Sequence, residues 1–235
     1  LVGELRDLET KGHTDRVVAL NKVDGKDVWQ TAKIGASYSS PVEFEWDGKK
    51  CYAVFASGGL VVLHSGDGKE LTRHPWETSY KVNAATPIVS GNEIFISSGY
   101  NRGCALLRLE GGKAVLVWEN KNMRNQFNTC VLWKDCFFGF DDKDLVCLDK
   151  KTGQVRWKQR GLGNACLKMA DEKLIIMTEM KGEVVIAEAS VDAFKEISRR
   201  KVLEGRSWVL PVLSDGKLYL RNNKGDMVCL EVSKQ

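Results

Sequence analysis

Three histidines, His13, His64 and His74, are the first side chains that could bind a metal ion or act as a general base. His64 and His74 are expected on adjacent strands, where two imidazoles could share a metal ion. Neither belongs to a cluster with the spacing of metal ligands, and a protein site normally supplies three or four donors. We therefore expect surface or hydrogen-bonded histidines and no metal site.

A run of acidic residues, Asp141-Asp142-Lys143-Asp144, is the other group that could attract a cation such as calcium. The run lacks the glycine and the terminal glutamate of an EF-hand loop, and it falls where a turn between two strands is expected. We interpret it as an exposed polar turn. The sequence also lacks the G-x-S-x-G, H-E-x-x-H, P-loop and glycine-rich dinucleotide motifs. It therefore offers no candidate catalytic residue.

The cysteines carry no recognisable redox or zinc motif. An odd number of them leaves at least one thiol unpaired within the chain, and none forms a C-x-x-C pair. Most lie inside apolar runs, so we expect buried free thiols that pack as small apolar side chains. The seven positions are Cys51, Cys104, Cys130, Cys136, Cys147, Cys166 and Cys229.

Composition and charge exclude several classes of protein. The 235 residues include 35 Lys and Arg against 31 Asp and Glu, and these charges are interspersed, which argues against a nucleic-acid partner. No apolar run approaches the roughly 18 residues of a membrane-spanning helix, and residues 1–15 are too charged for a secretory signal. We expect a globular chain without a membrane span. The sequence predicts no oligomeric state.

An internal repeat predicts the strands that would carry any site. A three-residue segment with an apolar residue at its first and third positions occurs six times. The third residues of successive segments are 39 to 46 residues apart. Most segments lead through a glycine turn into another short apolar strand, which is the pattern of a hairpin. The six segments are Val18-Ala19-Leu20, Val61-Val62-Leu63, Leu107-Arg108-Leu109, Val146-Cys147-Leu148, Val185-Ile186-Ala187 and Val228-Cys229-Leu230.

A second hairpin precedes most of these segments, so that each repeat contains four short strands. Its turns are Asp47-Gly48, Ser90-Gly91-Asn92, Lys134-Asp135, Asp171-Glu172 and Asp215-Gly216. Four antiparallel strands repeated every 40 residues or so predict an all-β fold, a β-propeller of four-stranded antiparallel blades. We expect one propeller domain over residues 1–235, with about five to six blade units at 16–32, 36–78, 82–120, 125–161, 164–203 and 207–232.

The two ends of the chain do not complete a regular blade. The chain opens with two strands and closes with three, which is one strand too many for a five-bladed ring, and its first residue is Leu. We therefore expect part of a longer propeller of seven or eight blades, with an unusual five-bladed closure as the alternative. The one helix-like pattern, from Val191 to Arg200, falls where an outer hairpin is expected.

Two segments of the repeat resemble a known family. Residues 147–157, Cys-Leu-Asp-Lys-Lys-Thr-Gly-Gln-Val-Arg-Trp, and the weaker echo at residues 19–29 are similar to the A-L-D-x-x-T-G-x-x-x-W repeat of PQQ-binding-like β-propellers. Residues 85–91 and 210–220 resemble the inner hairpins of the PQQ-like repeat proteins abundant in planctomycetes. The resemblance implies WD40-like blades in which Trp29, Trp118 and Trp157 dock between neighbouring sheets.

The resemblance leaves two functions open. The family covers quinone-dependent dehydrogenases, the lipoprotein of the outer-membrane β-barrel assembly machinery, and proteins without assigned activity. Those dehydrogenases carry adjacent cysteines and calcium ligands, which have no match here. Our first hypothesis is a non-catalytic bacterial scaffold, periplasmic or secreted and without a cofactor, that binds a protein or a polar small ligand. The alternative is a fragment of a PQQ-dependent oxidoreductase that holds the quinone and calcium.

Binding residues are expected on the loops that enter the innermost strands, because these loops surround the channel mouth of a propeller. Amide, hydroxyl, aromatic and arginine side chains gather there and suit a polar ligand or peptide. Exposed aromatic rings among them would instead suit a carbohydrate polymer. A third possibility is that these side chains only satisfy main-chain groups between blades. The candidates are Tyr38, Ser39, Asn83, Asn125, Gln126, Asn128, Asn164, Arg206 and Trp208.

Overall fold

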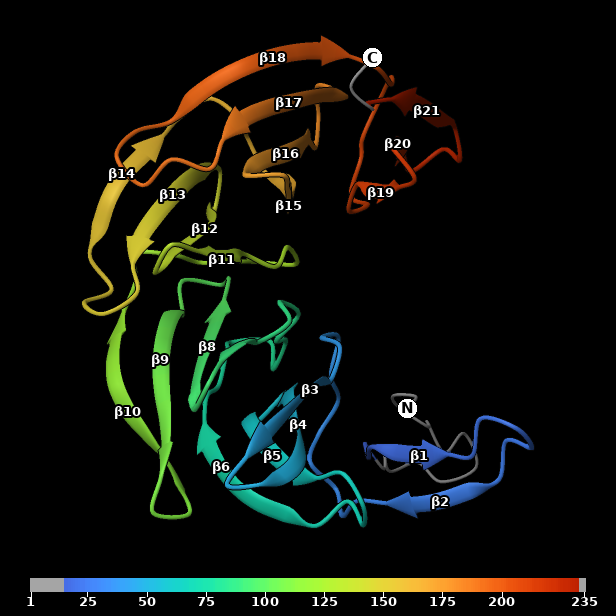
Figure 1. Cartoon of the computed structure of the whole chain (residues 1–235), viewed down its shortest axis with the longest axis vertical. Helices are drawn as coiled ribbons and strands as arrows, with labels where there is room; N and C mark the ends of the chain where they lie inside the picture. Colours follow the sequence, from blue (N-terminus) through green and yellow to red (C-terminus); the bar gives the residue numbers. More distant parts are fainter. Residues whose placement is uncertain (1–14, 233–235) are drawn as a thin grey trace. The chain divides into compact units, whose positions relative to one another are not determined.

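The computed structural model describes residues 15–232, and these residues confirm the all-β expectation (Figure 1). They form 21 strands in six antiparallel sheets, and the described residues contain no helix. It follows that no helix among them could cross a membrane. The segment from Val191 to Arg200, whose pattern is partly helical, ends in a strand as expected.

The chain divides into two compact units, one ending at Phe127 and one beginning at Asn128, and each is described by itself. Whether the two form a single domain stays a prediction. The first unit has a two-stranded sheet and two four-stranded sheets. Their strands are β1 (Val18–Leu20) and β2 (Asp27–Gln30); β3 (Val42–Trp46), β4 (Lys49–Ala56), β5 (Gly59–His64) and β6 (Glu70–Pro75); and β7 (Ile88–Ser90), β8 (Glu93–Ser98), β9 (Gly103–Glu110) and β10 (Lys113–Asn120).

The second unit has two four-stranded sheets and one three-stranded sheet. Their strands are β11 (Val131–Trp133), β12 (Cys136–Asp141), β13 (Asp144–Asp149) and β14 (Val155–Gln159); β15 (Ala165–Ala170), β16 (Lys173–Thr178), β17 (Glu183–Glu188) and β18 (Lys195–Lys201); and β19 (Val212–Ser214), β20 (Lys217–Arg221) and β21 (Met227–Glu231). In every sheet consecutive strands pair with one another, which is the meander of a propeller blade.

The hairpin turns lie where the sequence predicts them. Asp47 and Gly48 both have positive φ, 52° and 67°, and Asp215 and Gly216 repeat the pattern with 48° and 70°. Two successive residues with positive φ match the right-handed twist of the flanking strands, which is why Asp-Gly is favoured there. These turns fix the register of β3 with β4 and of β19 with β20.

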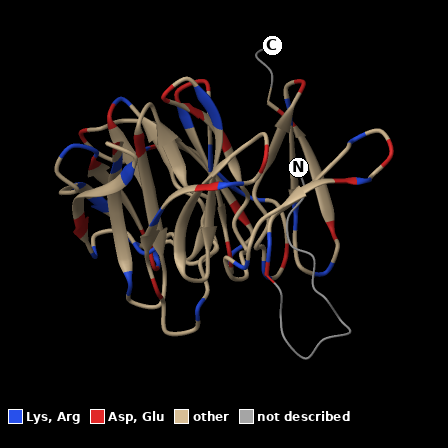
Figure 2. Ribbon diagram, turned by 90° about the horizontal axis from the view of Figure 1, so that it is seen from below, with Lys and Arg blue, Asp and Glu red and all other residues tan. Residues whose placement is uncertain are grey.

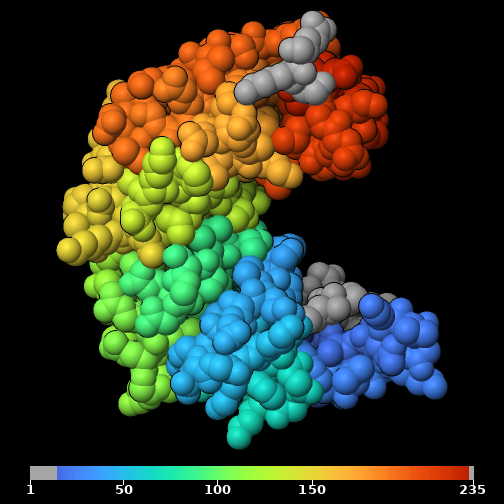
Figure 3. All heavy atoms as spheres, in the orientation of Figure 1, coloured from blue at the N-terminus to red at the C-terminus, as the bar shows by residue number. Residues whose placement is uncertain are grey.

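The core lies between the faces of neighbouring sheets, as blades require. In the first unit Phe55 and Leu60 of one sheet pack with Ile94 and Leu107 of the next. In the second unit Phe138 packs in the same way among side chains of the sheet that begins at β15. The space-filling view shows the atoms of β3–β6 lying directly against those of β7–β10 (Figure 3). Lys and Arg are interspersed with Asp and Glu along the ribbon (Figure 2).

A β-bulge recurs between the last two strands of five sheets and reveals which residues are equivalent. The register shift falls at Ala19/Leu20, Val62/Leu63, Leu116/Trp118, Cys147/Leu148 and Ile186/Ala187. The residues that follow the bulge on the outer strand are Trp29, Thr72, Trp118, Trp157 and Ser198. The tryptophan position of the repeat is therefore occupied by Thr72 in β6 and Ser198 in β18.

One of the six repeat segments is placed wrongly by the sequence pattern. Leu107 pairs with Leu116 next to the bulge, as Leu63 pairs with Glu70. The equivalent segment is therefore Ala105-Leu106-Leu107, two residues before Leu107-Arg108-Leu109. The reason is that the hairpin β9–β10 is longer than its counterparts, so an apolar pattern alone aligns it two residues too late.

Two of the three tryptophans reach the following sheet. The indole N–H of Trp29 donates to the carbonyl of Ser65 at 2.9 Å, and that of Trp157 donates to the carbonyl of Ser190 at 3.0 Å. A Cβ on Gly68 would lie 2.4 Å from the Trp29 ring, so this position requires glycine. The Trp118 ring lies 6.0 Å from Phe95 of its own sheet, and its docking between sheets stays a prediction.

Candidate functional site

The predicted binding residues lie on loops that lead into the first strand of a sheet, and they belong to both units. In the first unit the loop before β3 contains Tyr38 and Ser39. Ser37 and Ser39 both donate to the carbonyl of Phe55, at 2.8 and 3.0 Å. These bonds hold the loop on the sheet and leave Tyr38 67% exposed. Tyr38 is therefore the side chain of this loop that a ligand could reach.

Asn83 is enclosed in a hydrogen-bond network at the same end of the strands. Its side chain is 1% exposed, and its amide donates to the carbonyls of Ala56 at 2.7 Å and Trp76 at 3.3 Å. Its oxygen accepts from the Ser98 hydroxyl at 2.6 Å, which in turn accepts from the Trp76 indole at 3.1 Å. These bonds join β4, the residue that follows β6, and β8, so Asn83 acts as a structural link between the two sheets of this unit.

Asn125 and Gln126 differ in exposure, as Asn83 and Tyr38 do. Asn125 is buried, and its main-chain N–H donates to the Ser97 hydroxyl at 3.0 Å. Gln126 is exposed and rests on Gly99, where an added Cβ would lie 3.0 Å from the Gln126 Cα. The amide of Gln126 is thus the accessible group of this pair.

Sequence reasoning missed an aromatic and charged cluster beside these loops. The Arg102 guanidinium lies 3.4 Å from the centroid of the buried Trp76 ring and pairs with Glu119 at 2.5 Å. Tyr80 and Tyr100 meet edge to face with centroids 4.9 Å apart. Arg102 and Tyr100 lie in the β8–β9 turn, whose glycines are the signal that could have marked it.

In the second unit Asn128 and Asn164 form hydrogen bonds with residues in or next to the strands β15 and β16. The Asn128 amide donates to the carbonyl of Ala165, and its oxygen accepts from the Cys166 thiol at 3.1 Å. Burial, and then the charge of Glu179, raises the pKa of that thiol to about 12. The carbonyl of Asn164 accepts from the N–H of Glu179 at 2.8 Å. Both asparagines therefore stabilise the loop before β15.

Arg206 and Trp208 are the most accessible of the predicted residues in the second unit. The Arg206 guanidinium lies 3.5 Å from the centroid of the Trp208 ring, and Trp208 is 42% exposed. Arg206 Nε donates to Glu179 Oε1 at 2.5 Å, and Glu179 itself is 5% exposed. A buried carboxylate therefore holds the arginine over the indole. Glu179 was not predicted, although an acid directly after the apolar strand β16 was a usable signal.

Ser207, between these two residues, is buried as well. Its N–H donates to the carbonyl of Glu179 at 2.8 Å, while its hydroxyl has no hydrogen-bond partner among the described residues. Buried hydroxyls are normally satisfied, so a water molecule or ligand group is the expected partner.

His64, Asp141 and Asp144, which could have bound a metal ion, are paired within the chain. His64 Nδ1 lies 2.7 Å from Asp67 Oδ1, and His74 lies at the opposite end of the β5–β6 hairpin. Asp141 and Asp144 both pair with Lys158, at 2.9 and 3.3 Å, across the turn between β12 and β13. The described residues contain no group of three or more His, Cys, Asp or Glu placed to hold a metal ion. His13 lies outside the described residues.

Comparison with known families identifies the family to which the repeat belongs. Residues 6–159, about two thirds of the chain, match the model of the family described as outer membrane protein assembly factor BamB. The chain belongs to this PQQ-like repeat family. The resemblance based on residues 147–157 and 19–29 is thereby confirmed. No curated protein sequence matches the chain.

Solved structures with the same fold include a member of that family. BamB from Moraxella catarrhalis superposes with a TM-score of 0.70 at 16% identity, over 92% of this chain and 66% of that one. The C-terminal WD40 domain of Sif2 gives 0.65 at 10% identity, over 94% and 65%. The Pseudomonas aeruginosa periplasmic gluconolactonase PpgL gives 0.59 at 11%, over 93% and 75%. These likenesses show the propeller fold, and the chain spans just under two thirds of the BamB structure.

Proposed function

We propose that this protein is a non-catalytic scaffold of the BamB type that binds a protein partner through the exposed Arg206–Trp208 pair. The observation that carries the proposal is the stacked guanidinium and indole held in place by the buried Glu179. Arginine and tryptophan are the residue types that dominate protein interfaces, and a pre-positioned pair loses little side-chain entropy on binding. An apolar side chain of the partner would pack on Trp208, and its carbonyl groups would accept from Arg206.

The second unit presents this pair on either side of the buried Ser207. In the first unit Tyr38 and Gln126 are the corresponding accessible side chains. The setting we propose is the periplasm or another part of the bacterial envelope. It is supported by the family and by the periplasmic gluconolactonase among the structures of the same fold.

A photo-crosslinking experiment tests the scaffold. A benzoylphenylalanine residue replaces Trp208 in one variant and Val155, an exposed residue of β14, in a control variant. We expect one discrete protein adduct in intact source cells from position 208 and none from position 155. Adding Arg206→Gln to the first variant should weaken the adduct. Equal crosslinking from both positions would contradict a specific surface.

The quinone-dependent oxidoreductase remains the alternative that the sequence raised. Titration of the full-length protein with pyrroloquinoline quinone and Ca²⁺ tests it, with quinone absorbance and melting temperature as readouts. A ligand that binds the folded state alone raises the melting temperature by mass action. Saturable binding together with dye-linked alcohol oxidation would replace the scaffold proposal.

A further inference from the structure

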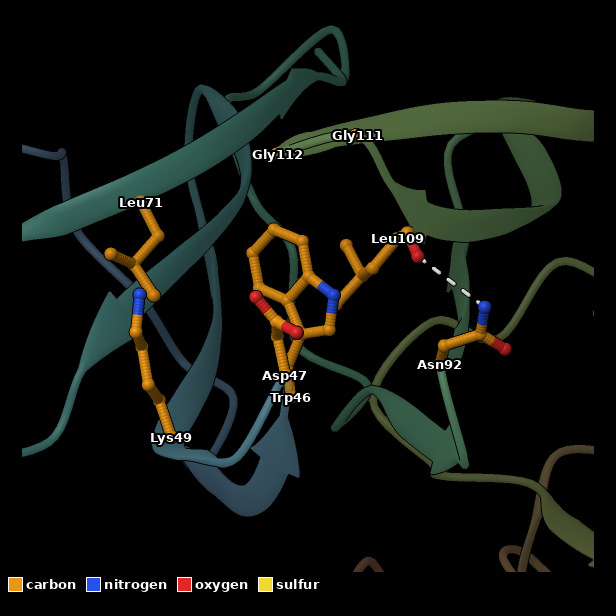
Figure 4. A pocket seen from close by; sticks show the side chains of 8 residues that line it. All are labelled: Trp46, Asp47, Lys49, Leu71, Asn92, Leu109, Gly111 and Gly112. Carbon is orange, nitrogen blue, oxygen red and sulfur yellow. Dashed lines mark hydrogen bonds between the residues drawn. The ribbon is translucent and has the colours of Figure 1, made fainter.

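A cleft opens between the sheets β3–β6 and β7–β10, at the end of the strands opposite to the loops described above. Its volume of about 620 Å³ lies in the range of roughly 300–1,000 Å³ that is typical of ligand pockets. Figure 4 shows the half-buried Trp46 standing between the side chains of Leu71 and Leu109. The lining residues are Trp46, Asp47, Lys49, Leu71, Asn92, Leu109, Gly111 and Gly112.

The bulge register relates the cleft to the repeat. Thr72 occupies the position of Trp29 and Trp157, whose indoles donate to a carbonyl beyond their own sheets. The Thr72 hydroxyl accepts from the N–H of Ala114 at 3.1 Å, so this short side chain reaches only the near strand of the next sheet. Leu71, the bulged residue beside it, lines the cleft. The cleft therefore lies next to the position from which Trp29 and Trp157 reach beyond their own sheets, and at this position the chain has no indole.

A carbonyl group equivalent to the one that accepts from the Trp29 indole is present in this cleft. Ser65, whose carbonyl receives the Trp29 indole, and Leu109 occupy equivalent positions, because the N–H of each donates across the sheet, to Lys50 at 2.9 Å and to Asn92 at 2.8 Å. The Leu109 carbonyl accepts from the Asn92 side chain at 3.3 Å (Figure 4). A carbonyl oxygen has two lone pairs and can accept a second hydrogen bond.

The interface that does contain its tryptophan provides a contrast. A hollow of about 560 Å³ between the sheets β11–β14 and β15–β18 includes Ser190, the acceptor of the Trp157 indole, and is lined largely by charged residues: Lys134, Asp171, Glu172, Lys173, Glu188 and Asp192. The cleft beside Thr72 instead keeps an aromatic ring and two leucines in its wall. Its chemistry favours an aromatic occupant.

We propose that this cleft binds a tryptophan side chain carried by an extended segment of a partner protein. The indole packs against Trp46 and the leucines, and its N–H donates to the carbonyl of Leu109. The occupant is a protein segment because both equivalent indoles of this chain are presented by a β-strand. Asp47 and Lys49 at the rim offer an acceptor and a donor to the main chain beside the indole. The site is independent of the Arg206–Trp208 pair, which belongs to the other unit.

An NMR titration with the peptide acetyl-Gly-Trp-Gly-amide tests the site in the full chain. The readout is the indole N–H resonance of Trp46, one of seven tryptophans, assigned through its loss in Trp46→Phe. We expect a saturable shift with a dissociation constant of about 1 mM, as befits a single small side chain. Acetyl-Gly-Ala-Gly-amide should cause no shift.

Two variants fill the cleft and one serves as a matched control. Leu71→Trp and, from the exposed rim, Lys49→Trp should weaken binding at least about tenfold. Ile197→Trp, at the equivalent bulge of β18 in the other unit, should leave the affinity unchanged. The proposal is overturned if the Trp46 resonance does not respond in the wild type. It is also overturned if both filled variants bind as well as the wild type, or if free L-tryptophan binds as tightly as the peptide.

Discussion

The indole N–H of Trp157 donates a 3.0 Å hydrogen bond to the carbonyl of Ser190, in the sheet that follows its own. The ring also lies 5.8 Å from Phe138 and 6.1 Å from Phe194. Replacing Trp157 with Phe keeps an aromatic ring but removes the donor and part of the contact area. We expect the free energy of unfolding to fall by about 1–2 kcal/mol, measured by urea denaturation.

Val155→Ala, on the same strand, is the control for that variant. Val155 is 41% exposed, and substitutions at such positions change stability by only about 0.5 kcal/mol. If Trp157→Phe were no more destabilising than Val155→Ala, the indole would not hold the two sheets together.

Asn83 shows how a predicted binding residue can be tested for a structural role. Asn83→Ala leaves the carbonyls of Ala56 and Trp76 and the hydroxyl of Ser98 without this partner in a buried place. We expect a loss of about 2–3 kcal/mol in the free energy of unfolding, because buried polar groups that lose their partners retain their desolvation cost. Ser98→Ala, which removes one member of the network, should cost less. A fully stable Asn83→Ala protein would instead favour a role in ligand binding.

The fold could be predicted from the sequence because each blade carries its own local signals. Asp-Gly turns such as Asp47-Gly48 and the alternating strand after each turn depend on neighbouring residues alone. The equivalence of Thr72 and Ser198 with the tryptophans could not be predicted. It depends on a β-bulge and on hairpin length, which shift the register without changing the apolar pattern.

The candidate site was harder to predict, because residue type does not reveal exposure. Asn83 and Trp208 both follow strands and precede apolar residues, yet one is buried in a network and the other is 42% exposed. Glu179 holds Arg206 from a position 27 residues earlier in the chain. Such a contact arises only when the sheets pack, so the acid directly after β16 marks a polar residue at a strand end but does not reveal its partner.

The cysteines give a prediction about thiol reactivity. Cys229 is exposed, whereas the other six are buried. Burial raises the pKa of Cys147 and Cys166, and the thiolate is the reactive form. We therefore expect iodoacetamide to modify one thiol quickly in the native protein and all seven in urea, followed by mass spectrometry. Cys229→Ser should abolish the fast modification, and rapid labelling of a second thiol would contradict the packing described here.

His74 predicts a pH dependence of stability. Its burial on β6 lowers its pKa, Arg102 adds to this effect, and Glu119 opposes it. The unfolded chain therefore binds a proton more readily than the folded chain between the folded pKa and the ordinary value of about 6.5. Stability is fully present above that value and falls as the pH drops below it.

A comparison of the wild type with His74→Gln measures this contribution. Urea unfolding at several pH values between about 5 and 7.5 should show a steeper loss of stability on acidification in the wild type. The difference in slope must stay below about 1.4 kcal/mol per pH unit, the limit for one proton. The two proteins differ at position 74 alone, so the difference between their profiles isolates this side chain. Identical pH profiles would show that His74 is as easily protonated in the folded chain as in the unfolded one.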